Sequence, residues 1–265
     1  MRLKGKCGIV VGAGQTPGDT VGNGRAAAML FAREGAKVML VDRDIKRAEE
    51  TAALIVAEGG NALCIAGDWT RAADCRAYVE ACITAWGRVD FLHNNVGIGA
   101  GDGPPDAITE DAYDRIMRVN LKGCLLSCQA VLPCMRANGS GSIVNISSIA
   151  AVAYAPGLTA YKLSKIGMNM LGTQLALSNA KYGIRVNTIM PGLMDTPMAI
   201  EGQSAARNVS KEELRAARGQ RVPLRGKMGS AWDVAHAALF LHSDEAAFIT
   251  AVALAVDGGQ SARSG

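Results

Sequence analysis

The chain has 265 residues, of which 49% are hydrophobic, and its formal net charge is +4 at pH 7. These values allow a sizeable core, and no apolar run approaches the roughly eighteen residues that a membrane span needs. The small, dispersed positive charge does not favour nucleic acid as a partner. We therefore expect one globular domain that covers residues 1–265.

Two further features bear on location and metals. The first residues lead directly into an apolar strand, which leaves no room for a signal peptide. The seven cysteines have an odd count and no paired metal-ligand spacing. We therefore expect a cytoplasmic protein with reduced thiols and without a metal site.

Strand-like and helix-like segments alternate along the whole chain. Apolar runs predict strands near residues 7–12, 37–41, 62–66, 89–93, 142–147, 184–189 and 251–256. Helical composition is found between them, as at residues 72–86, 113–135 and 161–181. This alternation predicts an α/β protein with a single-domain Rossmann fold, a doubly wound parallel sheet of about seven strands flanked by helices.

The first strand leads into a glycine-rich turn. Gly12 follows the strand, Gly22, Asn23 and Gly24 open a helix, and the next strand ends in Asp42. Strand, glycine turn, helix, strand and acid form the layout of a dinucleotide site. The glycines allow the backbone to approach the pyrophosphate, and the helix N-terminus supplies free amides.

Two adjacent side chains bear on the choice of cofactor. Asp42 can accept hydrogen bonds from the adenosine ribose and would repel a 2′-phosphate, which favours NAD over NADP. Arg43 argues in the other direction, because a basic residue there could accommodate the phosphate. We predict NAD, with both residues beside the ribose.

Ser148, Tyr161 and Lys165 have the spacing of an acid–base set. Ser148 follows a buried strand, and the other two lie four residues apart on one face of a helix that begins near Thr159. A nearby ammonium favours the phenolate and lowers a phenol pKa that is ordinarily about 10. The serine hydroxyl can hold the oxygen that gains or loses the proton. The pattern predicts hydride-transfer chemistry with Tyr161 as the general acid/base.

On these motifs the chain resembles the short-chain dehydrogenase/reductase family over essentially its whole length. The resemblance includes Asn94-Asn95-Val96-Gly97, which is similar to the family's Asn-Asn-Ala-Gly turn. It adds Asn120 to the catalytic set, as the holder of a water beside Lys165. It also implies cofactor contacts at Asp68, Trp69, Asn94, Asn95, Val96, Gly97, Tyr161, Lys165, Pro191, Gly192, Met194 and Thr196.

The resemblance further implies a mobile substrate flap at about residues 193–228. Tyr154, Met194 and Met198 are expected to line the substrate cleft together with Ser148, with ordinary packing as the alternative for the first three. A homotetramer or homodimer is implied as well, through helices near residues 121–135 and 161–180.

The glycine turn is longer than the family pattern, because nine residues separate Gly12 from Gly22. We align Gly12, Gly22 and Gly24 with the family glycines and treat the surplus around residues 15–20 as an insertion. A rival alignment uses Gly12, Gly14 and Gly18. The insertion either lies over the cofactor or is a bulge on the solvent side without catalytic meaning.

These observations predict reversible, NAD-dependent oxidation of a secondary alcohol to a ketone. One alternative is an NADPH-dependent 3-oxoacyl-carrier-protein reductase, which Asp42 disfavours. The other is a dinucleotide-binding regulator without catalysis, which the complete set of Asn120, Ser148, Tyr161 and Lys165 disfavours.

Overall fold

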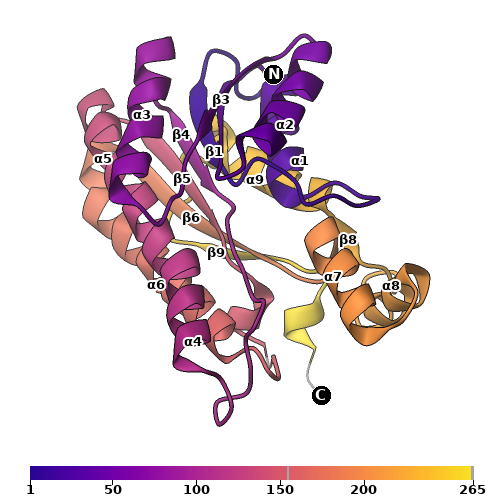
Figure 1. The fold of residues 1–265 in the computed structure, drawn as a ribbon. Helices are drawn as coiled ribbons and strands as arrows, with labels where there is room; N and C mark the ends of the chain where they lie inside the picture. Colours follow the sequence, from indigo (N-terminus) through magenta and orange to yellow (C-terminus); the bar gives the residue numbers. More distant parts are fainter. Residues whose placement is uncertain (154, 264–265) are drawn as a thin grey trace.

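The computed structural model describes residues 1–153 and 155–263, within which a seven-stranded parallel sheet forms the centre (Figure 1). The strand order is β3, β2, β1, β4, β5, β6 and β9. The bounds are β1 Cys7–Val11, β2 Lys37–Asp42, β3 Asn61–Ala66, β4 Phe91–Asn94, β5 Gly141–Ile146, β6 Ile184–Pro191 and β9 Ala253–Val256. This sheet confirms the predicted doubly wound, single-domain Rossmann fold.

Helices cover both faces of the sheet (Figure 1). One face carries α1 (Asn23–Arg33), α2 (Ile45–Ala57) and α9 (Ala231–His242), and the other carries α3 (Ala72–Trp86), α5 (Gly123–Asn138) and α6 (Thr159–Asn179). Each face has its own hydrophobic core. All five residues of β1 are buried, as expected for a central parallel strand covered on both sides.

Two predicted boundaries are wrong for local reasons. The helix predicted at residues 113–135 is three consecutive pieces, α4 (Glu110–Met117), a π-helical turn (Arg118–Lys122) and α5. It starts earlier than predicted because the Thr109 side chain caps α4 by accepting from the Ala112 amide at 3.3 Å. The strand predicted from residue 251 begins at Ala253, because Ala251 has a φ of 62°.

The segment predicted as a flap contains two helices that the sequence pattern did not predict. They are α7 (Pro197–Arg207) and α8 (Lys211–Gly219), which lie beyond the carboxyl ends of the strands (Figure 1). The short strands β7 (Met194–Asp195) and β8 (Gly229–Ser230) pair at their base. Four 3₁₀ turns complete the described part, at Ile149–Ala151, Ala180–Tyr182, Asp244–Ala246 and Gln260–Ala262. No helix within the described ranges is both long and apolar enough to cross a bilayer.

Two buried histidines lie in the core between the sheet and α1. His93 of β4 and His242 of α9 have ring centroids 5.7 Å apart, and both pack edge-on against Phe31. Neither ring nitrogen of His93 has a hydrogen-bond partner among the described residues. Burial lowers the pKa of His93 to about 3 and holds the pKa of His242 well below its ordinary value.

The buried His93 predicts a fold that loses stability in mild acid. An unfolded histidine titrates near pH 6.5, so below that pH the unfolded chain takes up a proton that the folded chain refuses. For His93 this lowers the free energy of unfolding by about 2 kcal/mol between about pH 7 and about pH 5. Urea unfolding of His93→Leu should show a flatter pH dependence by this amount. His236→Leu, which changes an exposed histidine of α9, is the control and should keep the wild-type slope.

Candidate active site

The end of β5 and the start of α6 bring three predicted catalytic residues together. Ser148 follows β5, and its hydroxyl accepts from the Ala150 amide at 3.1 Å. Tyr161 and Lys165 lie in the first turns of α6, with the Lys165 Nζ 5.5 Å from the Tyr161 ring centroid. A hydrogen bond joins the side chains of Tyr161 and Ser148. The predicted i, i+4 geometry of the tyrosine and lysine is therefore present.

The ammonium of Lys165 is buried and bound to the end of β5. Its Nζ donates to the Ile146 carbonyl oxygen at 2.9 Å, and the residue is only 2% exposed. Gly97 leaves room for it, because a Cβ at that position would lie 3.1 Å from Nζ. Burial lowers the pKa of Lys165 to about 8.

The phenol of Tyr161 does not have the lowered pKa that we expected from its lysine neighbour. Burial raises the pKa of Tyr161, and the hydrogen bond with Ser148 opposes this without overcoming it. The ammonium makes its hydrogen bond to Ile146 rather than to the phenol. Desolvation therefore outweighs the hydrogen bond with Ser148, which is the one opposing cause.

Asn120 lies in the π-helical turn between α4 and α5, a feature that is frequent at functional sites. Its Oδ1 accepts from the Ile98 amide at 2.8 Å, and its Nδ2 donates to the Ile98 carbonyl at 2.9 Å and to Ser164 Oγ at 3.0 Å. Ser164 in turn donates to the Tyr161 carbonyl at 2.7 Å. The side chain thus joins the loop after β4 to α6, and its predicted role in holding a water stays a prediction.

The glycine turn is built around a close backbone contact. Gly12 has a φ of 80°, and a Cβ on Gly24 would lie 1.9 Å from the Gly12 carbonyl oxygen. Asn95 Nδ2 donates to the same oxygen at 3.1 Å. α1 begins at Asn23, directly after Gly22. This geometry agrees with the alignment on Gly12, Gly22 and Gly24.

The residues at the start of α1 fit a dinucleotide diphosphate. Within the described residues, the N-cap Gly22 makes no side-chain cap and the first turn has no acidic residue. Asn23 Oδ1 and Thr20 Oγ1 are buried there without a hydrogen-bond partner in the described part of the chain. Free amides and a hydroxyl that can donate, such as that of Thr20, suit an anionic group at a helix N-terminus, whereas Asn23 Oδ1 can only accept.

The predicted ribose site lies at the end of β2. Asp42 Oδ2 accepts from the Gly14 amide and Oδ1 from the Asp44 amide, each at 3.0 Å. Arg43 is exposed. Arg47, which the sequence pattern did not single out, lies against the turn, because a Cβ on Gly14 would be 2.6 Å from the Arg47 Cβ. Arg47 lies in the first turn of α2, where no sequence motif identifies it as a candidate.

Several predicted cofactor residues direct their side chains into the interior. Asn94 Nδ2 donates to Asn145 Oδ1 at 2.9 Å, and its own Oδ1 accepts from Ser127. The indole of Trp69 is buried against Gly123. Contacts of Asn94 and Trp69 with a cofactor would therefore have to come from their backbone. Asp68 accepts from the amide and hydroxyl of Thr70, at 2.9 Å and 2.8 Å, which fixes the turn before α3.

The other residues of the predicted nicotinamide segment lie at the carboxyl end of β6. Gly192 donates to the Val256 carbonyl at 3.0 Å, directly after Pro191, the last residue of β6. Thr196 is the buried N-cap of α7. Val96 packs behind Gly12, where a Cβ would meet its Cγ2 at 2.8 Å.

The predicted substrate residues differ in their exposure to solvent. Met194 is buried in the core against Gly229, so its expected place in the substrate cleft is not supported by its packing. Met198 is 63% exposed at the start of α7. Tyr154 lies outside the described residues.

The inserted loop at residues 15–20 contacts the flap. A Cβ on Gly18 would lie 2.6 Å from Glu201 Oε1, and Asp19 Oδ2 is 3.1 Å from Lys211 Nζ. Lys211 also pairs with Glu201 at 2.8 Å. At the base of the loop, Gln15 bonds the Thr20 carbonyl and the Gly22 amide. We call the contacts of Gly18 and Asp19 with α7 and α8 the loop–flap contact.

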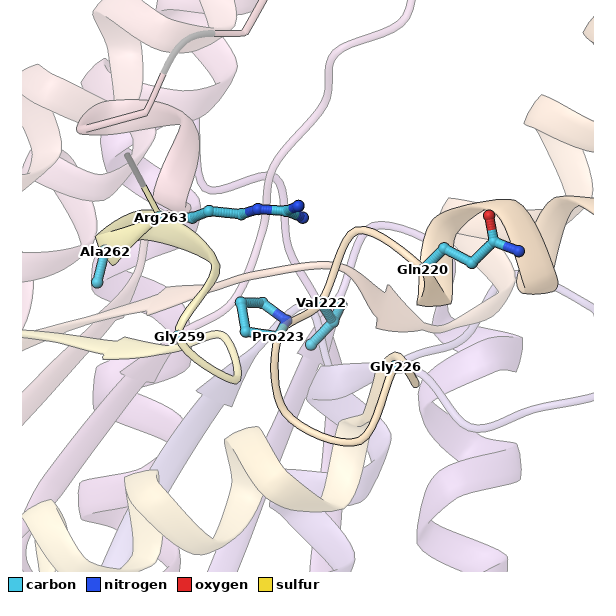
Figure 2. A pocket seen from close by; sticks show the side chains of 7 residues that line it. All are labelled: Gln220, Val222, Pro223, Gly226, Gly259, Ala262 and Arg263. Carbon is cyan, nitrogen blue, oxygen red and sulfur yellow. The ribbon is translucent and has the colours of Figure 1, made fainter. Parts of the chain in front are cut away.

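A pocket of about 600 Å³ lies between residues 220–226 and residues 259–263 (Figure 2). The residues that line it are Gln220, Val222, Pro223, Gly226, Gly259, Ala262 and Arg263. The Arg263 side chain extends toward the segment that carries Gln220 (Figure 2). Tyr161 and Ser148 do not line this pocket, so it does not contain the predicted catalytic side chains.

The close contact between Gly24 and Gly12 predicts different outcomes for two glycines of the same turn. Gly24→Ala places a methyl against the Gly12 carbonyl and should lower the free energy of unfolding by about 1–3 kcal/mol. Gly22→Ala is the matched control, because its Cβ would meet its nearest neighbour, Gln15, at 3.8 Å. Urea unfolding without cofactor measures both. Equal losses of unfolding free energy in the two variants would contradict the inference that Gly24 is in close contact with Gly12.

The loop–flap contact predicts a local effect of Asp19→Asn. Asp19 is 57% exposed, and exposed ion pairs contribute up to about 1 kcal/mol. Amide hydrogen exchange in residues 15–22 should therefore accelerate by up to about fivefold. Asp44→Asn is the control, because Asp44 pairs with Arg47 at 3.1 Å on the same edge but does not touch the flap. Exchange in residues 15–22 that equals wild type would contradict the contact.

Comparisons with known proteins agree with this geometry. A family model described as enoyl-(acyl carrier protein) reductase matches residues 19–261. The 2-(S)-hydroxypropyl-CoM dehydrogenase 3 of Xanthobacter autotrophicus is 37% identical over 98% of this chain and 98% of its own. A crystal structure assigned to the short-chain dehydrogenases/reductases, from Burkholderia xenovorans, has a TM-score of 0.93 and 40% identity, covering 100% of this chain and 99% of its own. Levodione reductase also has a TM-score of 0.93, with 31% identity over 99% of this chain and 100% of its own. The chain therefore belongs to the short-chain dehydrogenase/reductase family.

Proposed function

We propose that this protein is an NAD-dependent oxidoreductase that interconverts a secondary alcohol and a ketone. The observation that carries the proposal is the contact set of Ser148, Tyr161 and buried Lys165 at the carboxyl end of β5. It lies at the same edge of the sheet as the glycine turn after β1, where parallel α/β sheets bind their ligands.

Gly12, Gly24 and the first turn of α1 would hold the diphosphate, and Asp42 the adenosine ribose. When bound, NAD supplies the nicotinamide carbon that takes or gives the hydride. Asp42 supports NAD over NADP because a carboxylate repels a 2′-phosphate. Arg43 and Arg47 are the cations near enough to argue the other way.

The side chains at the end of β5 would handle the proton. Tyr161 as phenolate takes the hydroxyl proton of the alcohol, and Ser148 orients the same oxygen. The raised pKa of Tyr161 keeps the phenol protonated at neutral pH, and this is the form that donates a proton in the ketone-reducing direction. Lys165 would bond the nicotinamide ribose and favour the phenolate by its charge.

The substrate cleft and the assembly are also proposals. Met198, exposed at the start of α7, would contact an apolar part of the substrate under the flap of residues 193–228. Exposed apolar side chains on α6 support self-association as a dimer or tetramer, and these are Leu163, Ile166, Met170 and Leu177.

The proposal is tested by following NADH absorbance with a panel of secondary alcohols, hydroxy acids, steroids and dihydrodiols. NAD and NADP are compared on the same panel, and turnover with NADP alone would contradict the assignment to Asp42. Crotonyl-CoA with NADH and NADPH tests the enoyl reduction that the description of the family model suggests. Cofactor binding without turnover on any substrate would favour a regulatory role.

Tyr161→Phe keeps the ring and removes the proton donor. Turnover of the best panel substrate should fall by about three orders of magnitude or more, since the general acid/base is lost. NADH affinity, measured by fluorescence titration, should stay within about twofold. Tyr113→Phe, on the exposed side of α4, is the control. Retained activity in Tyr161→Phe would remove the residue from the mechanism.

A further inference from the structure

The first turn of α6 is capped by a distant loop. The first amides of a helix lack partners within it, and Leu158, the residue before α6, makes no side-chain cap among the described residues. The loop after β4 supplies the partners. The Thr159 amide donates to the Gly103 carbonyl at 3.3 Å.

Asp102 accepts from the next two amides of the helix. The Ala160 amide donates to Asp102 Oδ1 at 3.1 Å, and the Tyr161 amide donates to Asp102 Oδ2 at 2.8 Å. The carboxylate is held in this orientation because the Gly103 amide also donates to its Oδ1, at 2.9 Å. A negative charge at a helix N-terminus is stabilising, so both charge and geometry favour the contact.

The same loop passes directly beside the predicted catalytic side chains. A Cβ on Gly97 would lie 3.1 Å from Lys165 Nζ, and a Cβ on Gly99 would lie 3.4 Å from the Tyr161 ring. Asn120 holds the loop by both backbone atoms of Ile98. Residues 97–103 are therefore fixed at one end by Asn120 and at the other by Asp102.

We propose that Asp102 is a positioning residue for Tyr161. Its carboxylate fixes the first turn of α6, and thereby the backbone from which the phenol reaches Ser148. Without it, the amides of Ala160 and Tyr161 would turn to water and the first turn would open more often. A displacement of about 1 Å at a reacting group can lower the rate by about two orders of magnitude. The proposal rests on the proposed function only for its catalytic consequence.

Three variants test this proposal. Asp102→Ala removes both acceptors, and Asp102→Asn keeps one amide oxygen in nearly the same shape. Asp106→Ala removes an exposed carboxylate of the same loop and is the control. We would measure amide exchange at residues 159–161, NADH affinity by fluorescence, and kcat and KM with the panel alcohol that wild type oxidises fastest.

Asp102→Ala should accelerate exchange at residues 160 and 161 by about tenfold and lower kcat by about tenfold or more. NADH affinity and KM should stay within about twofold. Asp102→Asn should recover part of both losses, and Asp106→Ala should equal wild type. If Asp102→Ala fails to fold, the smaller loss in Asp102→Asn carries the test.

Accelerated exchange with unchanged kcat would overturn the proposal, because Asp102 would then only cap the helix. An equal loss of kcat in Asp106→Ala would overturn it as well. If wild type turns over no panel substrate, the proposed function fails instead. The capping by Asp102 is then tested by amide hydrogen exchange alone. Unchanged exchange at residues 160 and 161 in Asp102→Ala would contradict it.

Discussion

The buried ammonium of Lys165 is the constraint on which the rest of the site depends. Removing a charged amine from water costs of the order of several kcal/mol unless hydrogen bonds replace the water. The Ile146 carbonyl at the end of β5 supplies one, and the pKa of the lysine still falls to about 8. β5 must therefore end where this carbonyl faces α6. Glycine suits position 97, because a Cβ there would lie 3.1 Å from the ammonium.

A connected set of polar contacts holds α6 in register with this carbonyl. The Ile98 backbone, Asn120, Ser164 and the Tyr161 carbonyl are joined by successive hydrogen bonds of 2.7–3.0 Å. Such a network is rigid when its members are satisfied. The π-helical turn at Arg118–Lys122 is the local distortion that contains Asn120. The helix that carries the phenol is thus fixed by its neighbours as well as by its own backbone.

The sequence alone was sufficient where the determining contact is local or repetitive. The alternation of segments predicted the parallel sheet, and the four-residue spacing of Tyr161 and Lys165 predicted their shared face. The start of α1 at Asn23 also followed from neighbouring glycines. The directions of side chains could not be predicted in this way, because they depend on residues that pack against them from distant parts of the chain. Asn94 turns to Asn145 of the next strand, and no local pattern marks that choice.

The dependence on distant parts of the chain also explains why the sequence did not predict the roles of Asp102 and Asp19 or the raised pKa of Tyr161. Asp102 and Asp19 bond helices that are distant in the chain, so their roles appear only when the loops are placed. The Ser210–Glu213 capping box did offer a local signal for α8, in the spacing of serine and glutamate. The pKa of Tyr161 could not be predicted from spacing, since burial raises it and burial is a property of the whole fold.

Two loops with similar chemistry leave adjacent strands and contact different helices. β1 and β4 are neighbours in the sheet, and the chain order reverses between them. The loop after β1 reaches the flap through Asp19, and the loop after β4 reaches α6 through Asp102. Each carboxylate adjoins a glycine, and at Gly18 the missing side chain lets the backbone come close to Glu201 of the flap. In parallel α/β sheets, ligands bind where the connections diverge at such a reversal. The two aspartates therefore connect the flap and α6 to the loops that follow neighbouring strands of one sheet.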